Sequence, residues 1–154
     1  MEISRASKSD IGKLALLQRR YMEHHVNIDD YFTFEEDMTG KWIKYMEEFI
    51  EGDDNLALVA LEGEKIVGYM TGSIKERTPI YKEKRVGIIG DVFVVPEKRR
   101  KGVFTGLASE MLRWMRQKGV RYVEHPISSR NDVSMSAWKS MSFEDFMVWT
   151  RRKI

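Results

Sequence analysis

The fold of this chain is decided by residues 91–107, which read D-V-F-V-V-P-E-K-R-R-K-G-V-F-T-G-L. The first part is an apolar run of β-forming residues that ends at Pro96. Four consecutive cations follow, from Lys98 to Lys101, and then Gly102. After this glycine the apolar residues recur at the spacing of an amphipathic helix. The segment therefore predicts a strand, a basic turn and the start of a helix.

A basic turn at a helix start can hold a phosphorylated ligand. The first backbone N–H groups of a helix lack partners within it, and the helix dipole favours an anion at that end. The flanking cations can add charge-assisted hydrogen bonds. The alternative is a solvated basic turn before an ordinary helix, and the charges alone do not exclude it.

The same segment resembles the acyl-CoA-binding core of the GNAT superfamily of N-acetyltransferases, written V-x-P-x-x-R/Q-x-x-G-x-G/A. Val94, Pro96, Arg99 and Gly102 fall on this pattern in register. Phe104 departs from it, because the family usually has Gly or Ala there. The bulky ring either narrows the approach of a pyrophosphate or points into the core.

A second family signature, N-x-x-A-x-x-x-Y-x-x-x-G-F, is similar to residues 131–143. Here Ser134 replaces Ala, Trp138 replaces Tyr, and Ser142 replaces Gly. The two motifs occur in the family's order and at roughly its spacing. As a pair they are far more specific than either motif alone.

The resemblance implies a binding site for acetyl-CoA. In the family the backbone amides of the turn hold the CoA pyrophosphate, a role that would fall to Arg99, Arg100, Lys101, Gly102, Val103, Phe104 and Thr105. The strand residues Val92, Phe93 and Val94 would pair with pantetheine, which requires the next strand to diverge. Asn131 would bond to the pantetheine arm, or it would cap a helix, for which Asn is a preferred residue.

Trp138 would contact the coenzyme where the family has a tyrosine that protonates the departing thiolate. An indole N–H donates a hydrogen bond but is not a useful acid. A positioned general acid is worth about 10²–10⁴-fold in rate. Three outcomes remain open: Tyr69 or Tyr122 substitutes, water protonates the thiolate, or catalysis is weak. The simplest role for Trp138 is packing.

Two acidic residues are candidates for the catalytic base that deprotonates the amine. Asp91 lies in the apolar run before the basic turn. Burying a lone carboxylate there costs free energy, and this cost favours a functional site over a residue without a role. It matches the Asp of an acidic pair in members that resemble spermidine/spermine acetyltransferases, whereas Gly90 stands where their Glu would be. Glu124, on the next predicted strand, is the other candidate, with a structural salt bridge as its alternative role.

The segment 26–40 is predicted to be a loop that is rich in acids and aromatic rings and has no Lys or Arg. In the family a loop near the first two helices walls the acceptor pocket. Asp29, Asp30 and Tyr31 are therefore candidate substrate-binding residues for a cationic amine. A solvated acidic loop is the more ordinary interpretation.

The composition limits the other classes of function. With 154 residues, 42% apolar and 32% charged, we expect one globular domain over residues 1–154. The chain has no cysteine, which excludes disulfides and thiol catalysis, and its histidines show no metal-ligand spacing, so no metal site is predicted. We also expect no signal peptide, no membrane segment and a cytoplasmic location. A net charge of +2 is too small to indicate a nucleic-acid partner.

The periodicity predicts an α/β (α+β) fold, in which a mixed, mostly antiparallel sheet is flanked by about four helices. Ser7 and Asp10 form a capping-box pattern before the first helix, and Gly119 is suited to end the third. Gly68 and Gly72 indicate a bulge or a close backbone approach. Strands are expected at 2–6, 56–61, 65–74, 86–95, 122–127 and 143–151, with later helices near 39–50, 103–118 and 132–141.

With the resemblance, these patterns predict an acetyl-CoA-dependent N-acetyltransferase, in which a primary amine of a small molecule or peptide attacks the thioester directly and takes the acetyl group. The alternative is a CoA-binding protein of the same fold that has lost efficient catalysis and acts as a binding or regulatory module. Dimers are common in the family that the chain resembles, so a homodimer is among the expected states.

Overall fold

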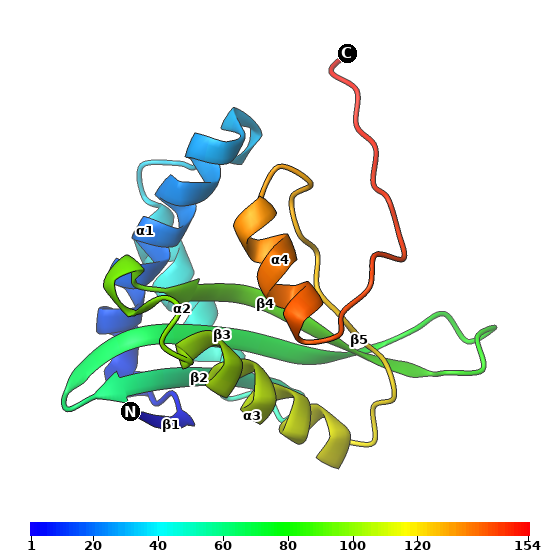
Figure 1. Ribbon diagram of the computed structural model, residues 1–154, viewed down its shortest axis with the longest axis horizontal. Helices are drawn as coiled ribbons and strands as arrows, with labels where there is room; N and C mark the ends of the chain where they lie inside the picture. The colour runs from blue at the N-terminus through cyan, green and yellow to red at the C-terminus, as the bar shows by residue number, and fades with distance from the viewer.

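The computed structural model describes residues 1–154 and contains one five-stranded sheet (Figure 1). Its spatial order follows the chain: β1 (Glu2–Arg5), β2 (Asn55–Glu62), β3 (Lys65–Glu76), β4 (Arg85–Val94) and β5 (Val123–Glu124). Strands β1 to β4 pair antiparallel with one another, and β5 is parallel to β4. The predicted mixed, mostly antiparallel sheet is confirmed.

Four helices cover the sheet, as predicted: α1 (Ile11–Ile28), α2 (Met38–Phe49), α3 (Val103–Gln117) and α4 (Asp132–Ser140). On one face Tyr69 of β3 meets Gln18 of α1 and Trp42 of α2. On the other face α3 crosses β3, and α4 joins α3 through a contact between Trp138 and Phe104. None of these helices combines the length and the apolar composition needed to cross a bilayer.

The α3 helix forms because its apolar residues recur at helical spacing and all face the sheet. Val103, Leu107, Met111 and Met115 are buried there in one continuous core, and each fully buried apolar side chain is worth about 1.5–3 kcal/mol. The sheet accepts the helix closely at Gly72, where an added Cβ would lie 2.5 Å from the Met111 sulfur. The predicted close approach is confirmed.

The predicted helix ends are also present. The Ser7 N–H donates to the Asp10 carboxylate at 2.8 Å before α1, and Gly119 takes a left-handed φ of 77° after α3. The predicted loop at 26–40 is shorter than expected, because α1 continues to Ile28 and a short 3-10 turn covers Asp30–Phe32.

Two predictions at the β5 edge need correction. The strand expected at 122–127 is only two residues long, and the stretch expected as a last strand at 143–151 is extended but belongs to no sheet. A strand needs a neighbour for its N–H and C=O groups. Beyond β5 the chain provides no neighbouring strand. The β-forming composition of the two stretches is therefore not sufficient to make them strands.

Candidate active site

The basic turn gives α3 an unusual start. Gly102 caps the helix with φ of 80°, and Arg100 is also left-handed with φ of 59°. The backbone N–H groups from Arg100 to Thr105 donate to no acceptor within the chain. Consecutive free N–H groups at a helix start form a concave donor set for an anion, so this turn has the groups that a pyrophosphate requires.

The cations of the turn have different surroundings. Lys98 forms an ion pair with Glu62, and Arg99 folds back so that its Nε donates to the Val94 carbonyl at 3.1 Å. Arg100 and Lys101 are exposed and lie in no ion pair within the chain. Only these two therefore remain available to a phosphate without breaking a contact.

One edge of β4 is open beyond its first residues. β5 pairs with β4 only at Gly87 and Ile88. At Ile89 a side chain contacts the edge of β4 in place of a neighbouring strand: the His125 Nδ1 lies 2.9 Å from the Ile89 carbonyl oxygen. The Val92–Val94 segment pairs with β3 on one side only. The diverging strand that pantetheine pairing requires is present.

A β-bulge at Gly90 and Asp91 sets the direction of the Asp91 side chain. Met70 pairs with Val92 and Gly72 with Ile89, so two residues of β4 oppose Thr71 alone. The Asp91 N–H donates to the Thr71 Oγ1 at 2.9 Å. An added Cβ at Gly90 would lie 2.8 Å from the same oxygen. The bulge thus needs glycine at 90, and it turns Asp91 away from the face that Ile89 occupies.

Asp91 lies among polar side chains of α1, α2 and β3, without a cation in ion-pair contact. Burial raises its pKa, and the neighbouring Trp42, the charge of His25, Tyr21 and Gln18 oppose the rise. The Trp42 Nε1–H is buried and has no acceptor within hydrogen-bond distance. An ionised Asp91 in this place would attract a cation and accept a proton more readily than an exposed carboxylate does.

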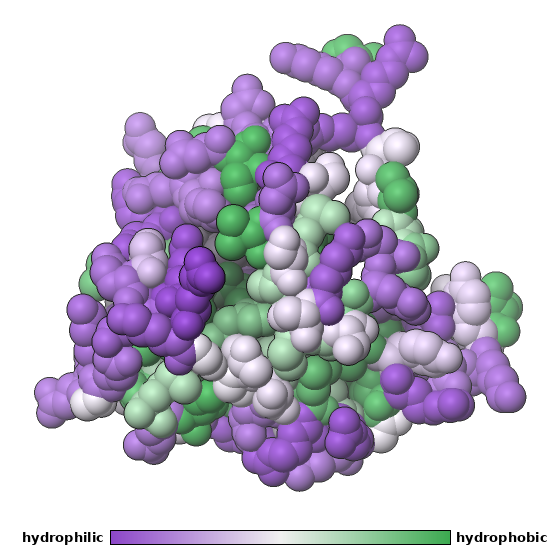
Figure 2. Space-filling model, viewed as in Figure 1, coloured by the Kyte–Doolittle hydropathy of each residue, from purple (hydrophilic) through white to green (hydrophobic).

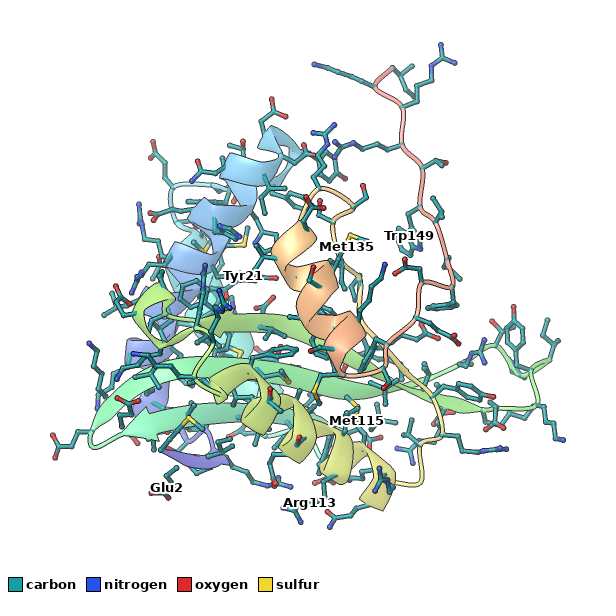
Figure 3. All side chains as sticks on the ribbon, viewed as in Figure 1. Glu2, Tyr21, Arg113, Met115, Met135 and Trp149 are labelled. Atoms are coloured by element: carbon teal, nitrogen blue, oxygen red, sulfur yellow. The ribbon has the colours of Figure 1, made fainter.

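The aromatic residues near Asp91 are held firmly. The Tyr69 hydroxyl donates to the Gln18 side-chain oxygen, and burial raises the pKa of Tyr21 far above its ordinary value. Figure 3 labels Tyr21 on α1.

A shallow hollow on α2 opens beside Trp42 and Tyr45. Burial raises the pKa of Tyr45, and the Asp91 charge adds to the rise. A larger hollow, between α1 and the β2–β3 turn, contains none of these residues.

Glu124 lies on β5 opposite Ile88 and is half-buried. Neighbouring strand residues alternate between faces, and His125 faces Trp138 of α4. Glu124 therefore points to the face that carries Asp91. It forms no ion pair within the chain, so its alternative role as a structural salt bridge has no partner here.

Trp138 is the centre of an aromatic cluster. Its ring centroid lies 4.9 Å from that of Phe104, 4.6 Å from His125 and 4.7 Å from Phe143. Phe104 therefore points toward α4 rather than across the turn. Neither proposed substitute acid is near this cluster, because Tyr69 faces α1 and Tyr122 is exposed before β5.

Asn131 caps α4, as its alternative role predicted. Its Oδ1 accepts from the Ser134 N–H at 3.1 Å. This bond uses the side-chain oxygen and leaves the amide Nδ2 hydrogens to donate. Capping and a bond to the pantetheine arm are therefore compatible.

Of the candidate substrate-binding residues at 29–31, Asp29 forms a structural ion pair. Asp29 is 8% exposed, and its carboxylate binds Arg151 and lies 3.3 Å from Arg130. The bond from Arg151 holds the pKa of Asp29 below its ordinary value. Asp30 and Tyr31 are exposed. No three His, Asp or Glu side chains meet in a group that would hold a metal ion.

Sequence reasoning missed several residues of the site. Thr71 and Gln18 carry no motif, and their roles depend on contacts across 20 and 51 residues. His125 was visible only as a lone histidine on a predicted strand. For Gly90, the one available signal was a glycine inside a β run next to an acid, which is typical of a bulge.

Comparison with known proteins agrees with this geometry. The acetyltransferase (GNAT) family matches residues 19–143. An uncharacterized N-acetyltransferase of Archaeoglobus fulgidus is 28% identical over 127 residues, which cover 80% of each protein. An aminoglycoside N(6')-acetyltransferase type 1 of Salmonella typhimurium is 25% identical over 100 residues, 64% of this chain and 69% of the relative.

A solved structure shares the fold. It is a predicted acetyltransferase from Clostridium acetobutylicum with acetyl-CoA, and it superposes with a TM-score of 0.80 at 18% identity. The match covers 99% of this chain and 95% of the other. The expected fold class is therefore confirmed.

Proposed function

Because this chain belongs to the acetyltransferase (GNAT) family, we propose that it transfers an acetyl group from acetyl-CoA to a primary amine that binds beside Asp91 as a cation. The observation that carries the proposal is the Asp91 carboxylate, which is directed by the bulge into a group of aromatic and polar side chains and forms no ion pair within the chain, His25 acting on it through its charge alone. An ammonium group would supply the missing charge.

Acetyl-CoA would supply the activated acetyl thioester. The free N–H groups from Arg100 to Thr105 would hold its pyrophosphate, with Arg100 and Lys101 adding charge. The open edge of Val92–Val94 would hold the pantetheine arm, together with the Asn131 amide. These donors and edges suit a long ligand that carries a diphosphate at one end.

Asp91 would act in two successive ways. Its charge first favours the protonated amine. The carboxylate then takes one proton, so that the neutral nitrogen has a lone pair for direct attack on the thioester carbonyl. The C–N bond forms, the C–S bond breaks, and the second proton of the nitrogen passes through water to the departing CoA thiolate. The raised pKa of Asp91 favours this transfer. No cysteine is present to form an acyl-enzyme.

The acceptor is proposed to be a polyamine, an amino sugar, a lysine side chain or a peptide N-terminus. Tyr21, Trp42 and Tyr45 lie around Asp91 and can present ring faces to a cation. Similarity to an aminoglycoside acetyltransferase supports including amino sugars in this class.

A second candidate function is CoA binding with weak catalysis. It is favoured by Trp138, which packs against three other rings and offers no acid to the departing thiolate. Water would then be the proton source.

The deciding experiment measures thiol release from acetyl-CoA over a panel of amines, with thermal unfolding in the presence of CoA. The proposal expects stabilisation by CoA and amine-dependent release that Asp91→Asn removes. Stabilisation without release from any amine would leave the binding module. No stabilisation and no release would overturn both.

A further inference from the structure

His125 lies where the open edge of β4 begins. Its Nδ1 lies 2.9 Å from the Ile89 carbonyl oxygen, and because a carbonyl only accepts, Nδ1 carries the hydrogen of this bond. The other ring nitrogen, Nε2, has no hydrogen-bond partner within the chain, and it is not enclosed, since the Trp42 Nε1 alone is both buried and unpartnered. The ring therefore presents a free nitrogen to a space that a ligand can enter.

The proposed coenzyme would bring its thioester to this ring. The free N–H groups from Arg100 to Thr105 follow the C-terminal end of β4, so a diphosphate held there fixes one end of the ligand. The arm would then run along the free edge of Val92–Val94 toward Ile89. Figure 2 shows green atoms set back between the purple side chains of α1 and the paler α4, where Figure 1 draws β4. The far end of the arm would lie between Asp91 and His125.

Asp91 and His125 approach this point from opposite faces of the sheet. Asp91 lies on the face that α1 and α2 cover, whereas the His125 ring centroid lies 4.6 Å from that of Trp138 on α4. An amine beside Asp91 would attack the carbonyl from one face and leave the sulfur to the other. The Trp138 indole is no acid, and the two tyrosines considered above lie elsewhere. His125 is the side chain at this place that can exchange a proton.

On the basis of the proposed function, we propose that His125 carries the second proton of the amine to the departing thiolate. Water beside the attacking nitrogen brings this proton to Nε2, so an N–H bond of the amine breaks and an Nε2–H bond forms. The C–S bond then breaks with its electron pair on sulfur, and the Nε2–H bond breaks as the S–H bond forms. His125 is neutral again, and Asp91 holds the first proton.

The surroundings of His125 suit a group that is neutral between turnovers. Burial lowers the pKa of His125, the bond to Ile89 opposes this change, and the charge of His25 on α1 adds to it. No carboxylate contributes. A neutral ring can accept a proton at neutral pH, and the resulting imidazolium is more acidic than a thiol, whose pKa is about 8.5. The ring face of Trp138 can stabilise this cation while it exists.

The test compares thiol release from acetyl-CoA by His125→Asn and by the control His24→Asn. An Asn side chain can still donate to the Ile89 carbonyl, but it takes up no proton. His24 is a half-buried histidine of α1 with no role in this transfer. We expect kcat for the best amine to fall by about 10²-fold in His125→Asn and to change little in His24→Asn. Both variants should be stabilised by CoA as much as the wild-type chain is.

The pH profile gives a readout that a structural role would not change. The wild-type kcat/KM should fall in acid as Asp91 and His125 each become protonated, and His125→Asn should lose one of these two ionisations. A matching readout is rescue: added imidazole should restore part of the rate of His125→Ala in proportion to its concentration, and should not affect His24→Ala.

The results separate this inference from the proposed function. Release by His125→Asn at the wild-type rate, or a loss in His125→Ala that imidazole does not reduce, would overturn the role of His125 and leave acetyl transfer standing. No release by the wild-type chain with any amine would remove both. If circular dichroism shows that neither variant folds, the wild-type profile decides, because an acid limb with a single ionisation excludes the role of His125.

Discussion

Asp29 and Asp91 are the same residue type in two neighbourhoods that differ in charge. Asp29 is buried against Arg130 and Arg151, and its pKa is held low. Asp91 has the polar groups of Trp42, Tyr21 and Gln18 around it and feels the charge of His25, but it forms no ion pair, and burial raises its pKa. One carboxylate has its countercharge built into the chain, whereas the other lacks one.

The contrast separates a structural acid from the acid that we propose to be functional. A buried, unpaired carboxylate destabilises the folded state at neutral pH, and such groups are concentrated at functional sites. A paired one joins distant segments, here the end of α1 and the C-terminal stretch 143–151. Sequence patterns mark both acids as candidate site residues. They cannot distinguish a structural acid from a functional one, because the difference depends on which side chains contact each carboxylate in the folded chain.

The largest expected effect is that of Asp91→Asn. We expect kcat/KM for the best amine to fall by about 10²–10⁴-fold, since the proton acceptor is lost while the shape is kept. The melting temperature at pH 7 should rise, because a costly buried charge is removed. Steady-state thiol release and calorimetry measure the two quantities. Unchanged kinetics would remove Asp91 from the mechanism.

Asp29→Asn should give the opposite result in the same two measurements. The melting temperature at pH 7 should fall, because Arg151 and Arg130 lose their countercharge, while kcat changes little. Arg151→Ala should cause a similar loss, and the double variant should lose less than the sum of the two. A fall in kcat as large as that of Asp91→Asn would place Asp29 in the reaction and erase the contrast.

The pH dependence of stability should differ in sign between the two. The folded-state pKa of Asp29 is lowered, so its contribution is present above the unfolded value of 3.8 and is lost as pH falls through the folded pKa. The folded-state pKa of Asp91 is raised, so stability is lost as pH rises above 3.8 and through the folded pKa. Melting curves against pH measure how far each Asn variant differs from the wild-type chain in stability. We expect both differences to shrink only in acid, the gain of Asp91→Asn first and the loss of Asp29→Asn at lower pH.

Gly90→Ala tests whether the bulge at Gly90 and Asp91 is needed to direct the Asp91 side chain. The new Cβ would meet the Thr71 Oγ1 at 2.8 Å, so we expect a loss of about 1–3 kcal/mol in stability together with lower kcat. Gly12→Ala is the control, because nothing lies within 4 Å of a Cβ there. Equal behaviour of the two variants would show that the bulge tolerates a side chain.

The smallest effect is expected for Tyr21→Phe. Tyr21 helps to hold the pKa of Asp91 down, so its loss should shift the acid limb of the kcat/KM profile to higher pH, with less than about a tenfold loss in rate at the optimum. Tyr31→Phe is the counterpart beside Asp29, where the backbone N–H rather than the phenol donates. An unshifted limb in Tyr21→Phe would show that Asp91 does not set the profile.

Much of the fold could be predicted because it depends on local patterns. The helical spacing after Gly102, the Ser7–Asp10 cap and the glycine after α3 each specify their element within a few residues. The turn from Arg100 to Thr105 could be predicted for the same reason, since its free N–H groups follow from where the helix begins. The last predicted strand was wrong because a strand also depends on a neighbour.

The sequence by itself determined the order of strands and helices as far as α4, the helix start with free N–H groups and the supply of buried apolar residues, since these follow from propensity and period along the chain. Only the tertiary structure decided which acid is paired, where Trp138 and Phe104 point, and that β5 ends unpaired. Each of these depends on side chains brought together from distant positions, and the charge, burial and edges that they create exist only after the chain has folded.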